Sequence, residues 1–222
     1  MREILTLVRK DLDVEVRTKE TLASLLLLGL LTLLVLSFAF DPTSAMRAEA
    51  APGALWVAVT FAGVLALGRA FLIERENDCL EGLLASPVDR GNIYLAKTLS
   101  TFVLMAIAQL GIVPVFVLFF DVEPTPALVG VLAAVMLGVL GLAALGSLLA
   151  AIAVRTRARE VLLPLLMLPL IVPAFIAGVR ATQDLLAGGS LAAAQPWLGS
   201  MLAIDVIFLV VGWLLFGAVV EE

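Results

Sequence analysis

Six apolar stretches, each long enough to cross a lipid bilayer as a helix, constrain this 222-residue chain more than any other feature. An α-helix rises about 1.5 Å per residue, so about 20 apolar residues cross about 30 Å of hydrocarbon. The composition agrees, because 62% of the residues are hydrophobic and only 15% are charged. A soluble enzyme, a nucleic-acid-binding protein and a disordered scaffold are therefore disfavoured. We predict an all-α integral membrane protein.

The whole chain is predicted to form a single transmembrane domain, residues 1–222. Short polar or proline-containing segments separate the apolar stretches. The six predicted spans are about 21–40, 53–73, 95–120, 127–154, 161–179 and 198–220. Residues 1–20 precede the first span, and residues 74–92 form a long connection between the second and third spans.

Residues 1–20 have the pattern of an amphipathic helix. Ile4, Leu5, Val8 and Leu12 recur at helical spacing, and basic and acidic side chains surround them. Such a helix is typical of the membrane surface, with its apolar face in the headgroup region. We therefore expect an N-terminal interfacial helix. The alternative is a solvated tail with incidental periodicity.

The basic residues predict the orientation in the membrane. Of the fourteen Lys and Arg residues, twelve lie in the N-terminal segment, around the second–third connection, or in the fourth–fifth connection. The connections on the other side hold only Arg47 and Arg180. Because Lys and Arg accumulate in cytoplasmic loops, we expect both termini in the cytoplasm.

Small residues recur every fourth position in two of the spans. This spacing places them on one helix face, where neighbouring backbones can approach closely. The series are Ala54, Ala58, Ala62, Ala66 and Ala70 in the second span, and Gly130, Ala134 and Gly138, then Ala143, Ser147 and Ala151, in the fourth. The second-span series favours packing within the chain. The fourth-span series is equally compatible with a second copy.

The connection 74–92 is the strongest candidate for a functional site. Its first half is polar, whereas Leu80, Leu83 and Leu84 form a small apolar face that ends before Pro87. A short acidic amphipathic helix suits docking into a groove of a soluble partner. If it lay on the membrane instead, anionic headgroups would repel its acids. The predicted interface consists of Glu74, Arg75, Glu76, Asp78, Leu80, Glu81, Leu83, Leu84 and Pro87.

Two ionisable residues within the spans are further functional candidates. Arg69 lies near the cytoplasmic end of the second predicted span. Asp205 lies about eight residues into the sixth, where we expect outside water to reach it. Neither belongs to a recognisable catalytic constellation.

The residue types present argue against metal binding and ATP hydrolysis by this chain. It has no histidine and a single cysteine, Cys79, so no multi-residue metal site is expected. It also has no G-x-x-x-x-G-K-[ST] phosphate loop, so any ATP chemistry must belong to another polypeptide. We therefore expect a non-catalytic chain, without catalytic or metal-binding residues.

The connection 74–92 also carries a family resemblance. Glu74-Arg75-Glu76, followed by Leu80-Glu81-x-Leu83-Leu84-x-x-Pro87, resembles the membrane subunits of type-2 ABC exporters. More narrowly, the chain resembles the cytochrome c maturation protein B family of haem exporter membrane subunits. Further matching segments cover about half the chain in the expected order: residues 51–58, Leu65-Ala66-Leu67 with Arg69, Ala96-Lys97, and Leu168-Pro169-Leu170-x-x-Pro173. Asp78-Cys79 and Gly68 depart from the family pattern.

The resemblance implies a type-2 ABC exporter-like fold in a bacterial cytoplasmic (inner) membrane, with the connection 74–92 seated on an ABC ATPase subunit. It implies that two ATPases drive two copies of this chain, together with a haem-handling membrane subunit and a small helper protein. The output would be release of a haem-loaded chaperone on the outer side. No cofactor is expected on this chain, since ATP and haem would lie on partners. Alternatives are a type-2 ABC exporter subunit for another cargo, and a non-ABC transporter or scaffold.

Overall fold

The structure is a computed structural model that describes residues 2–40, 45–76, 89–153 and 159–221. These residues form seven α-helices and no strands. The helices are α1 (Arg2–Thr18), α2 (Glu20–Ala39), α3 (Ala45–Glu76), α5 (Arg90–Phe119), α6 (Ala127–Ala153), α7 (Arg159–Leu186) and α8 (Leu191–Glu221). The predicted all-helical class is confirmed.

Six of the helices are long and apolar enough to cross a membrane. The candidate spans are Glu20–Ala39, Met46–Gly68, Arg90–Phe119, Ala127–Ile152, Leu163–Leu186 and Leu191–Val219. Several helices extend beyond the apolar stretches of the sequence. For example, α8 starts at Leu191, whereas the predicted span starts at residue 198. The number of spans agrees with the sequence prediction.

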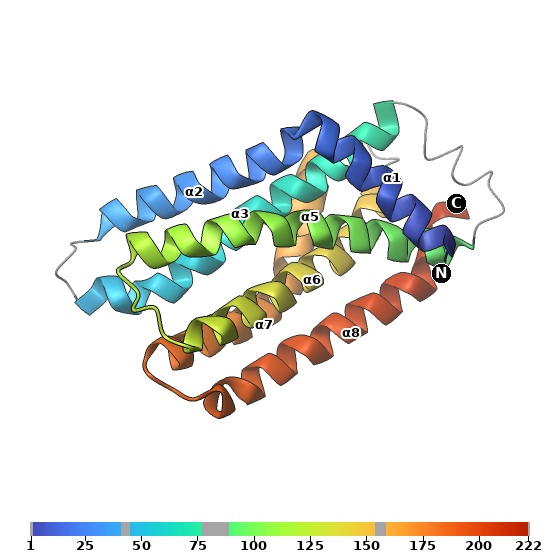
Figure 1. The fold of residues 1–222 in the computed structure, drawn as a ribbon. Coiled ribbons are helices and arrows are strands. Elements are labelled where there is room, and N and C mark those ends of the chain that lie inside the picture. Colours follow the sequence, from blue (N-terminus) through green and yellow to red (C-terminus); the bar gives the residue numbers. More distant parts are fainter. Residues whose placement is uncertain (1, 41–44, 77–88, 154–158, 222) are drawn as a thin grey trace.

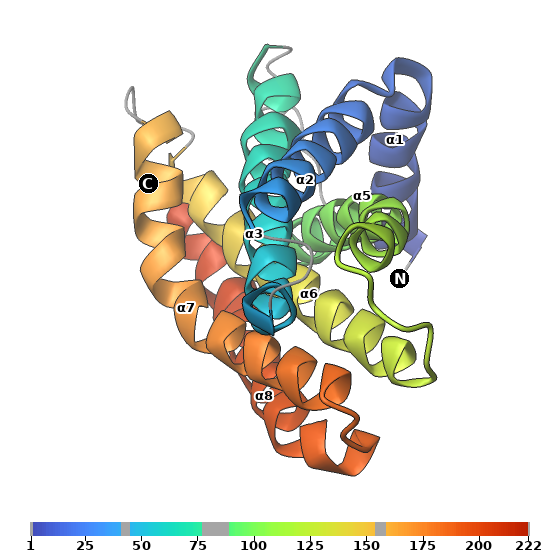
Figure 2. The ribbon, with the colours of Figure 1, turned by 90° about the vertical axis from the view of Figure 1, so that its left-hand side faces the viewer.

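The six long helices form one bundle, and α1 crosses it at an angle (Figure 1). The start of α1, the end of α3, the start of α5 and the end of α8 lie at the same end, here called the terminal end. α6 packs against α3, α5, α7 and α8, so it is the central helix. Viewed along the bundle, α1 and α2 lie on one side, and α7 and α8 lie on the other (Figure 2).

The small-residue series pack inside this bundle. Ala58 and Ala66 of α3 are completely buried, as are Ala134 and Ser147 of α6. Close packing of this kind supplies dispersion contacts where the surrounding lipid offers no hydrophobic drive for helix association. Both series therefore face neighbouring helices of the same chain.

Trp56 of α3 is seated in a socket made by two glycines. A Cβ atom at Gly138 of α6 or at Gly178 of α7 would overlap with the indole ring. The indole Nε1 donates a hydrogen bond to Thr182 Oγ1 at 3.1 Å, and the Phe175 ring lies 5.1 Å away, centroid to centroid. The ring is only 2% exposed, so this contact joins α3, α6 and α7 in the core.

Replacing Gly178 by Ala should destabilise the bundle. The added methyl group would overlap with the Trp56 ring, and overpacking of a close-packed core costs about 1–3 kcal/mol. We expect a lower midpoint of thermal unfolding in detergent. Gly199→Ala is the matched control, because a Cβ at Gly199 meets no atom within 4 Å and alanine favours a helix. Equal midpoints of thermal unfolding for Gly178→Ala and Gly199→Ala would show that Gly178 does not pack tightly against Trp56.

Candidate functional site

The predicted docking connection joins two helices at the terminal end. Glu74, Arg75 and Glu76 form the last residues of α3, and α5 starts at Arg90. The remaining members of the predicted interface lie outside the described residues: Asp78, Leu80, Glu81, Leu83, Leu84 and Pro87. The surroundings of the connection are therefore defined by α3, by the start of α5 and by α1.

The first turn of α5 is fixed at its N-cap. Asp89 Oδ1 accepts hydrogen bonds from the backbone N–H groups of Gly91 and Asn92, at 2.9 and 3.3 Å. An N-cap of this kind stabilises a helix by about 1 kcal/mol. Gly91 also lies directly against the indole of Trp213 on α8, leaving no room for a Cβ atom. The predicted docking connection therefore leads into α5, whose first turn is fixed by the Asp89 cap and by the contact of Gly91 with Trp213.

Tyr94, one turn further along α5, ties this helix to two others. Its side chain is fully buried, and its hydroxyl donates to the carbonyl oxygen of Ala144 on α6 at 2.9 Å. The carbonyl oxygen of Phe208 on α8 lies 3.3 Å from the same hydroxyl. A Cβ at Gly212 would overlap with the phenol, so the close approach of α5 and α8 depends on this glycine.

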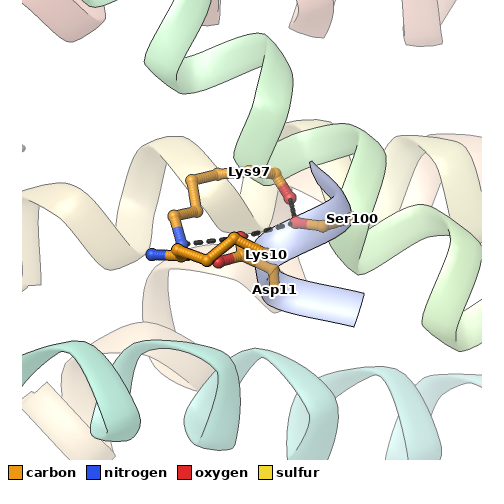
Figure 3. Close-up of polar contacts among 4 residues, drawn as sticks. All are labelled: Lys10, Asp11, Lys97 and Ser100. Carbon is orange, nitrogen blue, oxygen red and sulfur yellow. Dashed lines mark hydrogen bonds and ion pairs between the residues drawn. The ribbon is translucent and has the colours of Figure 1, made fainter. Parts of the chain in front are cut away.

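An ion pair joins α1 to α5 in the next turn (Figure 3). Lys97 Nζ lies 2.7 Å from Asp11 Oδ2, and Ser100 Oγ lies 3.2 Å from the same oxygen. The Lys97 side chain is 8% exposed and that of Asp11 is 19% exposed. Because water screens such a pair little, its two charges attract each other more strongly than those of an exposed surface pair. Lys10 Nζ also lies 3.3 Å from Asp11 Oδ1, but its side chain is 45% exposed.

The other end of α1 is tied to α2. Glu15 is 9% exposed, and its Oε1 accepts a hydrogen bond from the Leu22 backbone N–H at 2.8 Å. A carboxylate in this place satisfies a free donor in the first turn of α2 and complements the helix dipole. Between the two helices, Lys19 adopts a left-handed backbone conformation with φ 55°.

The sequence interpretation missed the Asp11–Lys97 pair. It used Lys97 as evidence for the orientation and for the family resemblance, and it placed Leu5 on the apolar face of the N-terminal helix. In the structure Leu5 is 61% exposed, whereas Val8 and Glu15 are buried. Two signals were present: Asp11 and Glu15 are four residues apart and share a face with Val8, and Lys97 lies inside a predicted span.

The two intramembrane candidates differ in what the structure describes. Arg69 lies in α3, at a position whose side chain lies outside the described part. Asp205 of α8 is 1% exposed, contrary to the expectation that water reaches it. Its carboxylate lies against Gly141 of α6, and neither of its oxygens has a hydrogen-bond partner among the described residues. Asp205 therefore lies between α6 and α8, apart from the terminal-end contacts.

No metal centre is found in the described part of the chain. Within those residues, no group of three or more His, Cys, Asp or Glu side chains could hold a metal ion. The arrangement at the terminal end consists of packing and polar contacts between helices. It connects the start of α5 to α1, α6 and α8 through an ion pair, a buried phenol and close glycine contacts.

Comparison with known proteins gives one consistent family. The model of the family described as CcmB protein matches residues 2–222. Heme exporter protein B of Paracoccus denitrificans is 29% identical over 192 residues, covering 86% of this chain and 88% of that protein. Heme exporter protein B of Pseudomonas aeruginosa is 30% identical over 188 residues, covering 85% and 84% of the two chains. The protein of the same name in Rhodobacter capsulatus is 28% identical over 177 residues, covering 80% and 81%.

Breaking the Asp11–Lys97 pair should loosen α1 while the six spans stay folded. We expect Lys97→Met to increase amide hydrogen exchange in residues 4–15, because Asp11 would lose its ion pair with α5 and keep only the Ser100 hydroxyl and its exposed contact with Lys10. Lys10→Met is the matched control and should leave this exchange nearly unchanged.

A double-mutant cycle with Asp11→Asn measures the energy of the pair. We expect a coupling energy of about 1–2 kcal/mol, within the range found for residues in direct contact. A coupling energy near zero would show that the two side chains do not hold α1 on α5.

Proposed function

The chain belongs to the CcmB family, and from this membership we propose that it is the membrane subunit of an ABC-type complex for cytochrome c maturation. The family match over residues 2–222 carries this proposal. Support also comes from the relatives named heme exporter protein B and from six apolar helices long enough to span a membrane. The complex would use ATP hydrolysis by a partner ATPase for haem delivery, releasing the haem-loaded chaperone on the outer side.

In this proposal residues 74–92 dock on the ATPase. The region continues α3, which is one helix from Ala45 to Glu76, and leads directly into α5. A displacement at Glu76 would reach the Trp56 socket along α3. A displacement at Asp89 would act on α1, α6 and α8 through Lys97 and Tyr94. Movement of the ATPase would thus be distributed over most of the bundle.

The chemistry of the complex is assigned to other subunits. ATP would bind to the partner, since this chain has no phosphate loop. Haem would be held by partner proteins, since this chain offers no histidine ligand. The proposed assembly contains two ATPase subunits, two copies of this chain, a haem-handling membrane subunit, a small helper protein and the haem chaperone.

The proposed location is a bacterial cytoplasmic membrane with both chain termini in the cytoplasm. The positions of the basic residues support this orientation. Arg9 lies on α1 and Lys97 on the first half of α5, which pack together, whereas Arg47 lies in the first turn of α3 and Arg180 near the end of α7, at the opposite end of the bundle (Figure 1). The candidate docking region then faces the compartment in which ATP is available.

Changing Glu81 and Leu84 together should release the ATPase. Glu81→Lys reverses a charge of the predicted acidic helix, and Leu84→Ala removes part of its apolar face. We expect the tagged double variant to lose most of the ATPase that the wild-type chain retains when isolated from its native membrane. The readout is the molar ratio of ATPase to this chain.

Asp13→Lys with Val16→Ala is the matched control, because it makes equivalent changes on the same end of the bundle. The Asp13 side chain is 63% exposed and Val16 is 69% exposed, and neither belongs to the predicted interface. The control should retain the ATPase. Wild-type retention by the Glu81/Leu84 variant would show that docking occurs elsewhere.

Deletion of this chain should abolish c-type cytochromes selectively. We expect haem-stained c-type bands to disappear, b-type haem spectra to persist, and a plasmid copy to restore the c-type bands. Normal c-type cytochromes in the deletion strain would instead favour an ABC exporter subunit for another cargo.

A further inference from the structure

The end of the bundle opposite the terminal end contains a cavity of about 950 Å³. Its lining comes from the first turns of α3, the connection between α5 and α6, and the connection between α7 and α8. Its size is at the upper end of the range for ligand sites in proteins. The proposed coupling to an ATPase does not use it.

Three carboxylate side chains line this cavity: Glu49 at the start of α3, and Asp121 and Glu123 in the α5–α6 connection. All three residues are exposed, and none of them forms an ion pair with another described residue. The cavity is therefore negatively charged and accessible from water.

The nearby cationic side chains make other contacts. The Arg47 guanidinium donates to the carbonyl oxygen of Phe119, and its central carbon lies 5.8 Å from the centre of the Phe120 ring. Arg180 Nη1 lies 3.5 Å from Gln183 Oε1. Neither cation forms an ion pair with Glu49, Asp121 or Glu123 among the described residues.

Apolar side chains line the rest of the cavity. Val122, Ala127 and Leu186 belong to its lining and are partly exposed. A Lys or Arg side chain combines an aliphatic stem with a cationic head, so it can bury the stem on such a surface while the head meets a carboxylate. The lining therefore matches a basic peptide segment with apolar neighbours.

Hydrogen-bonded helix ends hold two walls of the cavity. At the end of α7, Gly188 has φ 84° and the Gly189 N–H donates to the Asp184 carbonyl oxygen at 2.9 Å. A Cβ at Gly189 would overlap with that oxygen. At the end of α5, Asp121 has φ 56° and the Val122 N–H donates to the Val117 carbonyl oxygen at 3.0 Å. Both turns have the geometry of a Schellman motif.

We propose that this cavity binds a Lys- or Arg-bearing segment of a partner protein on the side of the membrane opposite the chain termini. The three carboxylates would receive the cationic heads, and the apolar lining would cover the stems. This binding stands independently of the proposed ATPase docking, which takes place at the other end of the bundle.

The test uses the full chain in phosphatidylcholine nanodiscs and a short fluorescein-labelled peptide of Lys, Leu and Gly. Fluorescence anisotropy gives the dissociation constant, with empty nanodiscs as the baseline. We expect Glu49→Gln/Asp121→Asn/Glu123→Gln to weaken binding about tenfold, because three exposed charge contacts are lost. Asparagine tolerates the left-handed backbone at position 121, so the variant should fold. An unchanged thermal midpoint checks this.

Two controls isolate the cavity charge. Glu49→Asp/Glu123→Asp keeps the charge and should bind within about twofold of wild type, and Asp13→Asn removes one acid at the other end and should have no effect. Equal binding by the neutralised variant, or equal binding of a peptide with Glu in place of Lys, would overturn the proposal. So would phosphatidylethanolamine that remains bound to the purified wild-type chain but not to the neutralised variant in native mass spectrometry, without any peptide binding.

Discussion

Large side chains seated against glycines hold this bundle together. Trp56 fills a socket formed by Gly138 and Gly178, while Gly212 receives Tyr94 in the same way. In lipid, helices gain little from the hydrophobic effect, so association depends on dispersion at close approach and on a few internal hydrogen bonds. Each socket supplies both, because Trp56 and Tyr94 also donate hydrogen bonds to a neighbouring helix. The positions of α3 and α5 relative to α6, α7 and α8 follow from these contacts.

In the proposed coupling, the same contacts would let the terminal end pass on a displacement of the ATPase. Four contacts follow one another at the start of α5. Asp89 caps the helix, Gly91 packs against α8, Tyr94 bonds to α6, and Lys97 pairs with Asp11 of α1. Neighbouring helices packed in this way have few independent rearrangements, since close-packed interiors transmit strain rather than absorb it. Under the proposed function, this packing would carry the displacement of the ATPase to the other subunits.

Much of the fold could be predicted from the sequence, because crossing lipid demands long apolar helices and small residues at their contacts. Single-chain periodicity did not predict which polar groups meet. Asp11 and Lys97 are 86 positions apart, and their pairing depends on how α1 lies on α5. Asp205 was expected to meet outside water because it lies about eight residues into the predicted sixth span. In the structure it is 1% exposed, because it packs against Gly141 of α6. The residues predicted to dock lie largely outside the described part, so their role rests on the sequence pattern.

The junction at Lys19 has a mechanical consequence. Its left-handed backbone and the bond from Leu22 to Glu15 fix a bend between α1 and α2, so the two helices cannot act as one straight rod. A displacement of α1 would therefore not be transmitted along the axis of α2. Such a displacement would instead reach α5 through the ion pair of Asp11 with Lys97. The predicted docking connection also leads into α5. In the proposed coupling, a displacement of α1 and a displacement of the docking connection would therefore both act on α5.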